Sequence, residues 1–149
     1  MKKILIVGYD FRASSLAGSF RLRQFAIELA MIGYTVKVAA AFSDTPSNFS
    51  DGANFDFGVT VIPPHVDYVS LSPSHNVIRR LLAWPDPSID WARQLMSDLG
   101  FAELVKWADV VLVSTPPHGL QAISIHIKRN YQKFVLADLR DDFRSEEHT

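Results

Sequence analysis

The sequence predicts an α/β domain built on a parallel, doubly wound sheet with helices on both faces. Short runs rich in Val, Ile, Leu and Ala recur along the chain, as expected for strands buried on both faces. Segments with apolar residues at helical spacing separate these runs, and strands that alternate with helices form parallel sheets through right-handed crossovers. The 149 residues, 48% hydrophobic and 21% charged, suit one globular domain.

Five apolar runs are the predicted strands. In chain order they are residues 3–7, 36–42, 59–62, 109–113 and 134–138. A polar loop at 8–15 follows the first strand, a loop rich in Ser, Asn, Asp and Gly at 43–58 follows the second, and Pro63 and Pro64 end the third. No internal repeat, linker or low-complexity segment interrupts them, so residues 1–149 are expected to form a single Rossmann-like domain.

Apolar spacing predicts the helices between these strands. Their ranges are 18–32 or 19–32, 77–84, 87–99, 101–108 and 120–130. Gly33 follows the first helix as a C′ glycine, and Gly100 is the expected break between the third and fourth. Asp86 and Pro87 are the expected N-cap and first residue of the third helix. Trp84, Trp91 and Trp107 are expected to serve packing.

Composition narrows the function classes. The net charge of −1 gives no electrostatic footprint for nucleic acid, and the absence of cysteine excludes disulfides, thiolate metal sites and cysteine nucleophiles. No metal-ligand spacing, Walker A motif or nucleophile elbow is present, so no metal or tightly bound cofactor is expected. No apolar run is long enough for a signal peptide or a membrane span, and a cytoplasmic location is expected.

One segment offers a weak contact with a membrane surface. Arg79 and Arg80 lie beside Leu81 and Leu82 in the predicted helix 77–84. Two charges make a weak anchor to anionic lipid, so a helix that lies on the domain with its arginines in water is the favoured interpretation. A peripheral membrane location stays open as the alternative.

The first candidate site lies where the helix after strand 3–7 begins. Gly18 and Ser19 occupy its first turn, with Arg21 and Arg23 close behind. Backbone N–H groups and the helix dipole make such a point a ready anion site. The dinucleotide fingerprint G-x-G-x-x-G is absent, which disfavours a nucleotide-dependent oxidoreductase or epimerase. The alternative is that Gly18 only relieves a tight entry to the helix.

Two further candidates follow the last two strands, at the edge where open α/β sheets bind ligands. His118, in the loop after strand 109–113, places an imidazole able to bind a ligand or move a proton, or it caps the next helix. The run from Asp138 through Arg140 and Asp141 to Asp142 offers a general base, a hydroxyl binder and a cation for an anionic group. A solvated turn with internal ion pairs is its alternative.

An ordered set of segments carries a family resemblance. The segments are residues 3–7, 18–23, 28–36, 85–87 with Trp91, 108–118 and 137–142. Together they resemble the N-terminal domain of GT-B glycosyltransferases of the family 4 (group 1) type, and they span almost the whole chain. Each is weak alone, whereas their order is fairly specific.

The resemblance implies one half of a GT-B fold, in an enzyme that transfers a sugar from a UDP- or GDP-sugar with retention of configuration. The acceptor would be a glycan, a lipid-linked sugar or a small molecule. Gly18, Ser19 and Arg21 would approach the donor diphosphate. His118 and the turn formed by Arg140 and Asp141 would face the acceptor and the transferred sugar.

The sequence also departs from this family. Ala17 stands before Gly18 where many relatives have two glycines, and Arg140 with Asp141 stands where many have a histidine. The C-terminal donor-binding domain is absent from this chain, so the 149 residues alone are expected not to turn over. The main alternative is a stand-alone flavodoxin-like domain that binds a ligand or a protein partner without catalysis.

Overall fold

A five-stranded, all-parallel sheet forms the centre of the described structure. The computed structural model describes residues 2–12, 17–44, 58–65, 88–115 and 117–139, and of residues 17 and 18 it describes the backbone. The strand order across the sheet is β3-β2-β1-β4-β5. The strands are β1 (Lys3–Asp10), β2 (Thr35–Phe42), β3 (Gly58–Val61), β4 (Val110–Thr115) and β5 (Phe134–Leu139).

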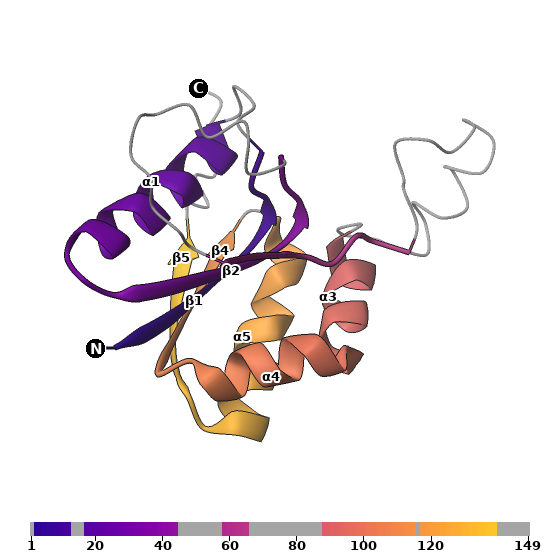
Figure 1. Cartoon of the computed structure of the whole chain (residues 1–149). Coiled ribbons are helices and arrows are strands. Elements are labelled where there is room, and N and C mark those ends of the chain that lie inside the picture. Colours follow the sequence, from indigo (N-terminus) through magenta and orange to yellow (C-terminus); the bar gives the residue numbers. More distant parts are fainter. Residues whose placement is uncertain (1, 13–16, 45–57, 66–87, 116, 140–149) are drawn as a thin grey trace, which may run out of the picture.

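Helices cover both faces of this sheet, as the sequence predicted. They are α1 (Ala17–Met31), α3 (Ser88–Ser97), α4 (Leu99–Trp107), the short 3₁₀ turn η2 (His118–Leu120) and α5 (Gln121–Tyr131). Figure 1 shows α1 on one side of the sheet and α3, α4 and α5 on the other. The fold is therefore an α/β, Rossmann-like doubly wound sheet. Its order matches the first five strands of the doubly wound order 3-2-1-4-5-6 rather than the flavodoxin-like order 2-1-3-4-5.

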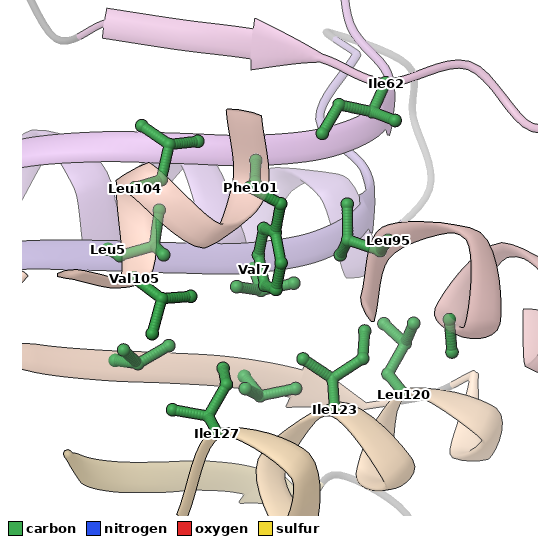
Figure 2. Close-up of a cluster of buried hydrophobic side chains, with 14 of the residues drawn as sticks. Leu5, Val7, Ile62, Leu95, Phe101, Leu104, Val105, Leu120, Ile123 and Ile127 are labelled. Atoms are coloured by element: carbon green, nitrogen blue, oxygen red, sulfur yellow. The ribbon is translucent and has the colours of Figure 1, made fainter. Parts of the chain in front are cut away.

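The larger part of the core lies between the sheet and helices α3, α4 and α5 (Figure 2). Leu5 and Val7 of β1 point into it, where Phe101 of α4 and Ile123 of α5 meet them. Trp91 of α3 is buried there too, and its indole N–H donates to the carbonyl oxygen of Ile62 over 2.7 Å. The prediction that Trp91 serves packing is confirmed.

Helix α1 covers the opposite face, over β1 and β2. Gly8 is the point of closest approach, because a Cβ at that position would collide with the side chain of Leu22. At the other end of the helix, Gly33 adopts a φ of 92°, in the region that favours glycine. Gly33 N–H donates to the carbonyl of Ala30, so the predicted C′ glycine is confirmed.

Two strands are longer at their carboxyl ends than the sequence indicated. The predicted loop at 8–15 was wrong at its start, because β1 continues to Asp10, where the chain still pairs with Phe42 of β2. The predicted exit loop from Ser114 was also wrong at its start, because Ser114 and Thr115 are the last residues of β4 and pair with β5. Pairing with a neighbouring strand extends both beyond their apolar runs.

The break between α3 and α4 lies at Asp98, and the predicted break at Gly100 was wrong. The carboxylate of Asp98 accepts a hydrogen bond from the backbone N–H of Phe101 over 2.7 Å, as an N-cap does. Gly100 is accommodated in the first turn of α4. The cap residue, with its side-chain acceptor, starts the new helix.

The amino ends of the strands are held together by hydrogen bonds. Backbone Lys3 N–H donates to the carboxylate of Asp109 over 2.8 Å, and Asp109 N–H donates back to the Lys3 carbonyl. Lys133, just before β5, donates through Nζ to the carbonyls of Lys106 and Ala108, at 3.0 and 2.6 Å. These are carbonyls that the C-terminal turn of α4 leaves available.

Several predictions lie outside the described residues. They concern the helix 77–84 with Arg79 and Arg80, the N-cap Asp86 with Pro87, and Trp84. Among the helices that the structure describes, none is long and apolar enough to cross a membrane.

Candidate functional site

The topological switch point of the sheet lies at the carboxyl ends of β1 and β4. These two strands are neighbours in the sheet, with Val7 paired to Val113. The chain leaves β1 toward α1 on one face, and it leaves β4 toward η2 and α5 on the other. Such a change of direction is the usual ligand site of an open α/β sheet, because the two connections diverge and leave room between them.

Asp138 is the polar centre of this edge. It lies in β5 opposite Ser114 of β4, and its carboxylate accepts from the Ser114 hydroxyl over 3.2 Å and from Arg21 Nη2 over 2.8 Å. The Thr115 hydroxyl donates to the Asp138 backbone carbonyl over 3.0 Å. The Asp138 side chain is only 9% exposed, so this ion pair joins a nearly buried carboxylate to a cation on α1. We call Arg21, Ser114, Thr115 and Asp138 the strand-end cluster.

Arg21 supplies the accessible part of this cluster. Its side chain is 47% exposed, and its guanidinium carbon lies 5.2 Å from the ring centre of Phe25, one helical turn further on. A guanidinium presents five N–H donors in a fixed plane, which suits recognition of phosphate or carboxylate oxygens. The ion pair and the ring together fix the orientation of this plane at the carboxyl edge of the sheet.

Small residues allow α1 to approach this edge closely. Gly8 of β1 pairs with Ala40 of β2, and Ser114 of β4 follows Val113, the partner of Val7. Gly18 lies in the first turn of α1, so its backbone is placed at the helix N-terminus as predicted. Ser19 lies in the same turn but is 2% exposed, so the predicted ligand contact by its side chain is not available from solution in this structure.

His118 lies at the start of η2, in the connection from β4 to α5. It is exposed and comes three residues after the end of β4. The next residue, Gly119, is buried against the first turn of α3, where an added Cβ would lie 2.8 Å from the backbone nitrogen of Ile89. This close approach fixes the turn that carries His118. Pro117 occupies the N-cap position of η2, so His118 is the first residue of this turn rather than its cap.

The structure thus brings Arg21 and Asp138 into contact and places His118 after β4, at the same edge of the sheet. Arg140, Asp141 and Asp142 lie outside the described residues. Within the described part of the chain, no group of three or more His, Asp or Glu side chains forms a metal site.

A second ion pair, between Asp10 and Arg12, lies at the end of β1 and was not predicted from the sequence. Arg12 Nη2 contacts the Asp10 carboxylate over 2.6 Å, and the Arg12 guanidinium lies 5.0 Å from the ring centre of Phe42. Partial burial raises the pKa of Asp10, but hydrogen bonds from Arg12 and its charge outweigh burial and hold that pKa below its usual value. The same contacts raise the pKa of Arg12. In the sequence, the opposite charges two residues apart were the signal that could have predicted this ion pair.

Comparisons with known proteins add little to this geometry. No family model matches the chain, and no curated protein matches it. Among solved structures, the chain is similar to the C-terminal domain (residues 78–226) of a hydrogenase from Pyrococcus furiosus, with 20% identity and a TM-score of 0.45. That alignment covers 93% of this chain and 91% of the other. The similarity is too low to carry an argument about function.

Proposed function

We propose that this chain is the acceptor-side domain of a retaining glycosyltransferase. In this proposal a sugar passes from a UDP- or GDP-sugar to a glycan, a lipid-linked sugar or a small molecule. The observation that supports it best is the 2.8 Å ion pair between Arg21 and Asp138. It joins two segments of the family resemblance, 18–23 and 137–142, which are far apart in the sequence, at one ligand-binding edge.

The start of α1 and the residues that follow β4 and end β5 have separate roles in this proposal. The backbone of the first turn of α1, with the guanidinium of Arg21, meets negative charge on the donor diphosphate. The charge that develops on the leaving diphosphate is then stabilised by groups already in place. His118 and Asp138 face the acceptor, whose hydroxyl needs a hydrogen-bond acceptor to orient it. A second Rossmann-like domain supplies the other donor contacts.

Nuclear magnetic resonance titration of the ¹⁵N-labelled chain tests this assignment. UDP-glucose and GDP-mannose are the probes, and NAD is the comparison ligand. We expect shifts in the amides of the first turn of α1 and of Ser114, Thr115, His118 and Gly119, with millimolar affinity for at least one nucleotide-sugar. Arg21→Ala should weaken this binding. Arg93→Ala should not, since Arg93 pairs with Asp90 on α3.

Two results would overturn the proposal. One is the absence of shifts at this edge at millimolar nucleotide-sugar, and the other is a stronger response to NAD. Binding without acceptor-dependent release of UDP or GDP, measured on a protein that contains both domains, would favour the alternative of a binding domain without catalysis.

A further inference from the structure

An apolar groove runs along the sheet face that carries α1. Among the described elements, α1 packs over β1 and β2 on this face, and the adjoining surface of β4 and β5 is left open. The groove between them has a volume of about 560 Å³. Its floor includes Val110, Leu112 and Leu136, and its wall includes Phe25 and Met31. Concave sites of roughly 300–1,000 Å³ with mainly apolar walls are typical of small-molecule binding.

The floor of the groove leads directly into the strand-end cluster. Side chains two residues apart in a strand point to the same face. Leu112 is therefore followed on this face by Ser114, and Leu136 is followed by Asp138. The apolar floor ends at a hydroxyl and a carboxylate that are hydrogen-bonded to each other.

The wall of the groove shows the same change from apolar to polar. Phe25 lines the groove, and Arg21, one turn nearer the helix N-terminus, stacks on it at 5.2 Å. Glu28 lies at the rim, where it accepts a hydrogen bond from Gln24 over 2.9 Å. Floor and wall thus change character at the same level, where the guanidinium of Arg21 meets the carboxylate of Asp138.

We propose that the groove and the strand-end cluster together bind an amphiphile, with an apolar chain in the groove and an oxygen-rich head at Arg21 and Asp138. This inference rests on the proposed function, in which the amphiphile is the acceptor and hence of the lipid-linked class. The five N–H donors of Arg21 are then shared between the head of the acceptor and the donor diphosphate. Leu136 and Met31 are 47% and 65% exposed, so an apolar chain would cover surface that now meets water. The apolar face of a protein helix would offer no oxygen atoms to the exposed N–H donors of Arg21 at the end of the groove, whereas an oxygen-rich head offers them.

Alkyl glucosides below their micelle concentration provide the test. Calorimetric titration of the chain with glucose, hexyl glucoside, heptyl glucoside and octyl glucoside should give an affinity that rises roughly fourfold for each added methylene. Octyl phosphate distinguishes a phosphate head from a sugar head, because the preferred head should bind more tightly on the same chain length. Arg21→Ala should remove that preference while the dependence on chain length remains.

A matched pair of variants locates the binding. Leu136→Gln should weaken octyl glucoside binding at least tenfold, and Leu99→Gln should leave it unchanged. Leu99 is equally apolar and 83% exposed, but it lies on α4, on the other side of the sheet. Met31→Gln is a second groove variant on a separate element, in case Leu136→Gln unfolds the chain.

The inference is overturned if affinity does not depend on chain length or if the two leucine variants behave alike. It is also overturned if the chain forms a dimer that Leu136→Gln abolishes, since a second copy would then cover the groove. If the alkyl glucosides fail to bind but a nucleotide-sugar binds, only the proposal of an amphiphilic ligand is refuted. If alkyl glucoside affinity depends on chain length but no nucleotide-sugar binds, the proposed glycosyltransferase function is refuted and an amphiphile-binding domain is left.

Discussion

The ion pair between Arg21 and Asp138 can be tested by a double-mutant cycle in which each is replaced by alanine. Arg21→Ala leaves a carboxylate that is 9% exposed with the Ser114 hydroxyl as its described side-chain partner. Asp138→Ala leaves the Ser114 hydroxyl, in a residue 2% exposed, without that partner. A buried polar group that loses its partner costs about 1–3 kcal/mol.

The expected coupling energy between the two substitutions is smaller than the loss of unfolding free energy in either single variant. Arg21 is 47% exposed, so water screens its charge and the pair is weaker than a fully buried one. We expect each single variant to lower the free energy of unfolding by about 1–2 kcal/mol. The double variant should be less destabilised than the sum by about 1 kcal/mol.

Urea unfolding followed by circular dichroism measures these differences, provided that the unfolding slope stays constant. The matched control is the ion pair of Arg93 and Asp90, in which Arg93 Nη1 lies 3.2 Å from the Asp90 carboxylate. Their side chains are 71% and 45% exposed. Its coupling should not exceed about 0.5 kcal/mol. If the coupling energy of Arg21 with Asp138 is no larger than that of the control pair, the ion pair does not join α1 to β5 as described. The candidate site built on that ion pair would then be wrong.

Three further predictions follow from the same structure. Gly119→Ala should destabilise the chain by about 1–3 kcal/mol in thermal unfolding, because its Cβ would lie 2.8 Å from a backbone nitrogen of α3. Gly58→Ala is the control and should have little effect, because the nearest atom to its Cβ is 3.7 Å away. Equal destabilisation by the two variants would contradict this reasoning. Asp10 has a lowered pKa when folded, so it stabilises the fold above pH ~4 and this contribution is lost as the pH falls through that lowered value. Arg12→Ala should raise the pKa of Asp10, followed by NMR of its carboxyl carbon, and an unchanged value would refute the cause given. Trp91→Phe should cost about 1–3 kcal/mol in urea unfolding, since it leaves a buried carbonyl without its 2.7 Å donor, and a neutral effect would contradict that hydrogen bond.

The fold followed from the sequence because its signals are local. Apolar runs of strand length, separated by helical spacing, need no long-range information, and Gly33 marks the end of α1 by its own backbone freedom. The errors came where a neighbour decides the outcome. Gly8 and Ser114 look like loop residues from their side chains, yet pairing with the adjacent strand holds both in the sheet.

The site could be predicted only to the level of the sheet edge. Chain order and parallel pairing bring the ends of β1, β4 and β5 together, so residues near Gly18, His118 and Asp138 were expected to be neighbours. The partner of each side chain was not accessible, because Arg21 and Asp138 are 117 residues apart and their contact depends on the register of β5 and the depth of α1. The groove depends on how far α1 reaches across the sheet, which no local pattern encodes.

The contact made by Lys133 gives the molecule a chemical reporter of its own local structure. The Lys133 nitrogen donates hydrogen bonds to two carbonyls at the end of α4, and an acylating reagent has to reach that same nitrogen. Reaction therefore requires that the Lys133 side chain first leave these carbonyls. Lys128, exposed on α5, faces no such requirement. The ratio of labelling at the two amines therefore reports how often the hydrogen bonds between Lys133 and the end of α4 open, without any added probe.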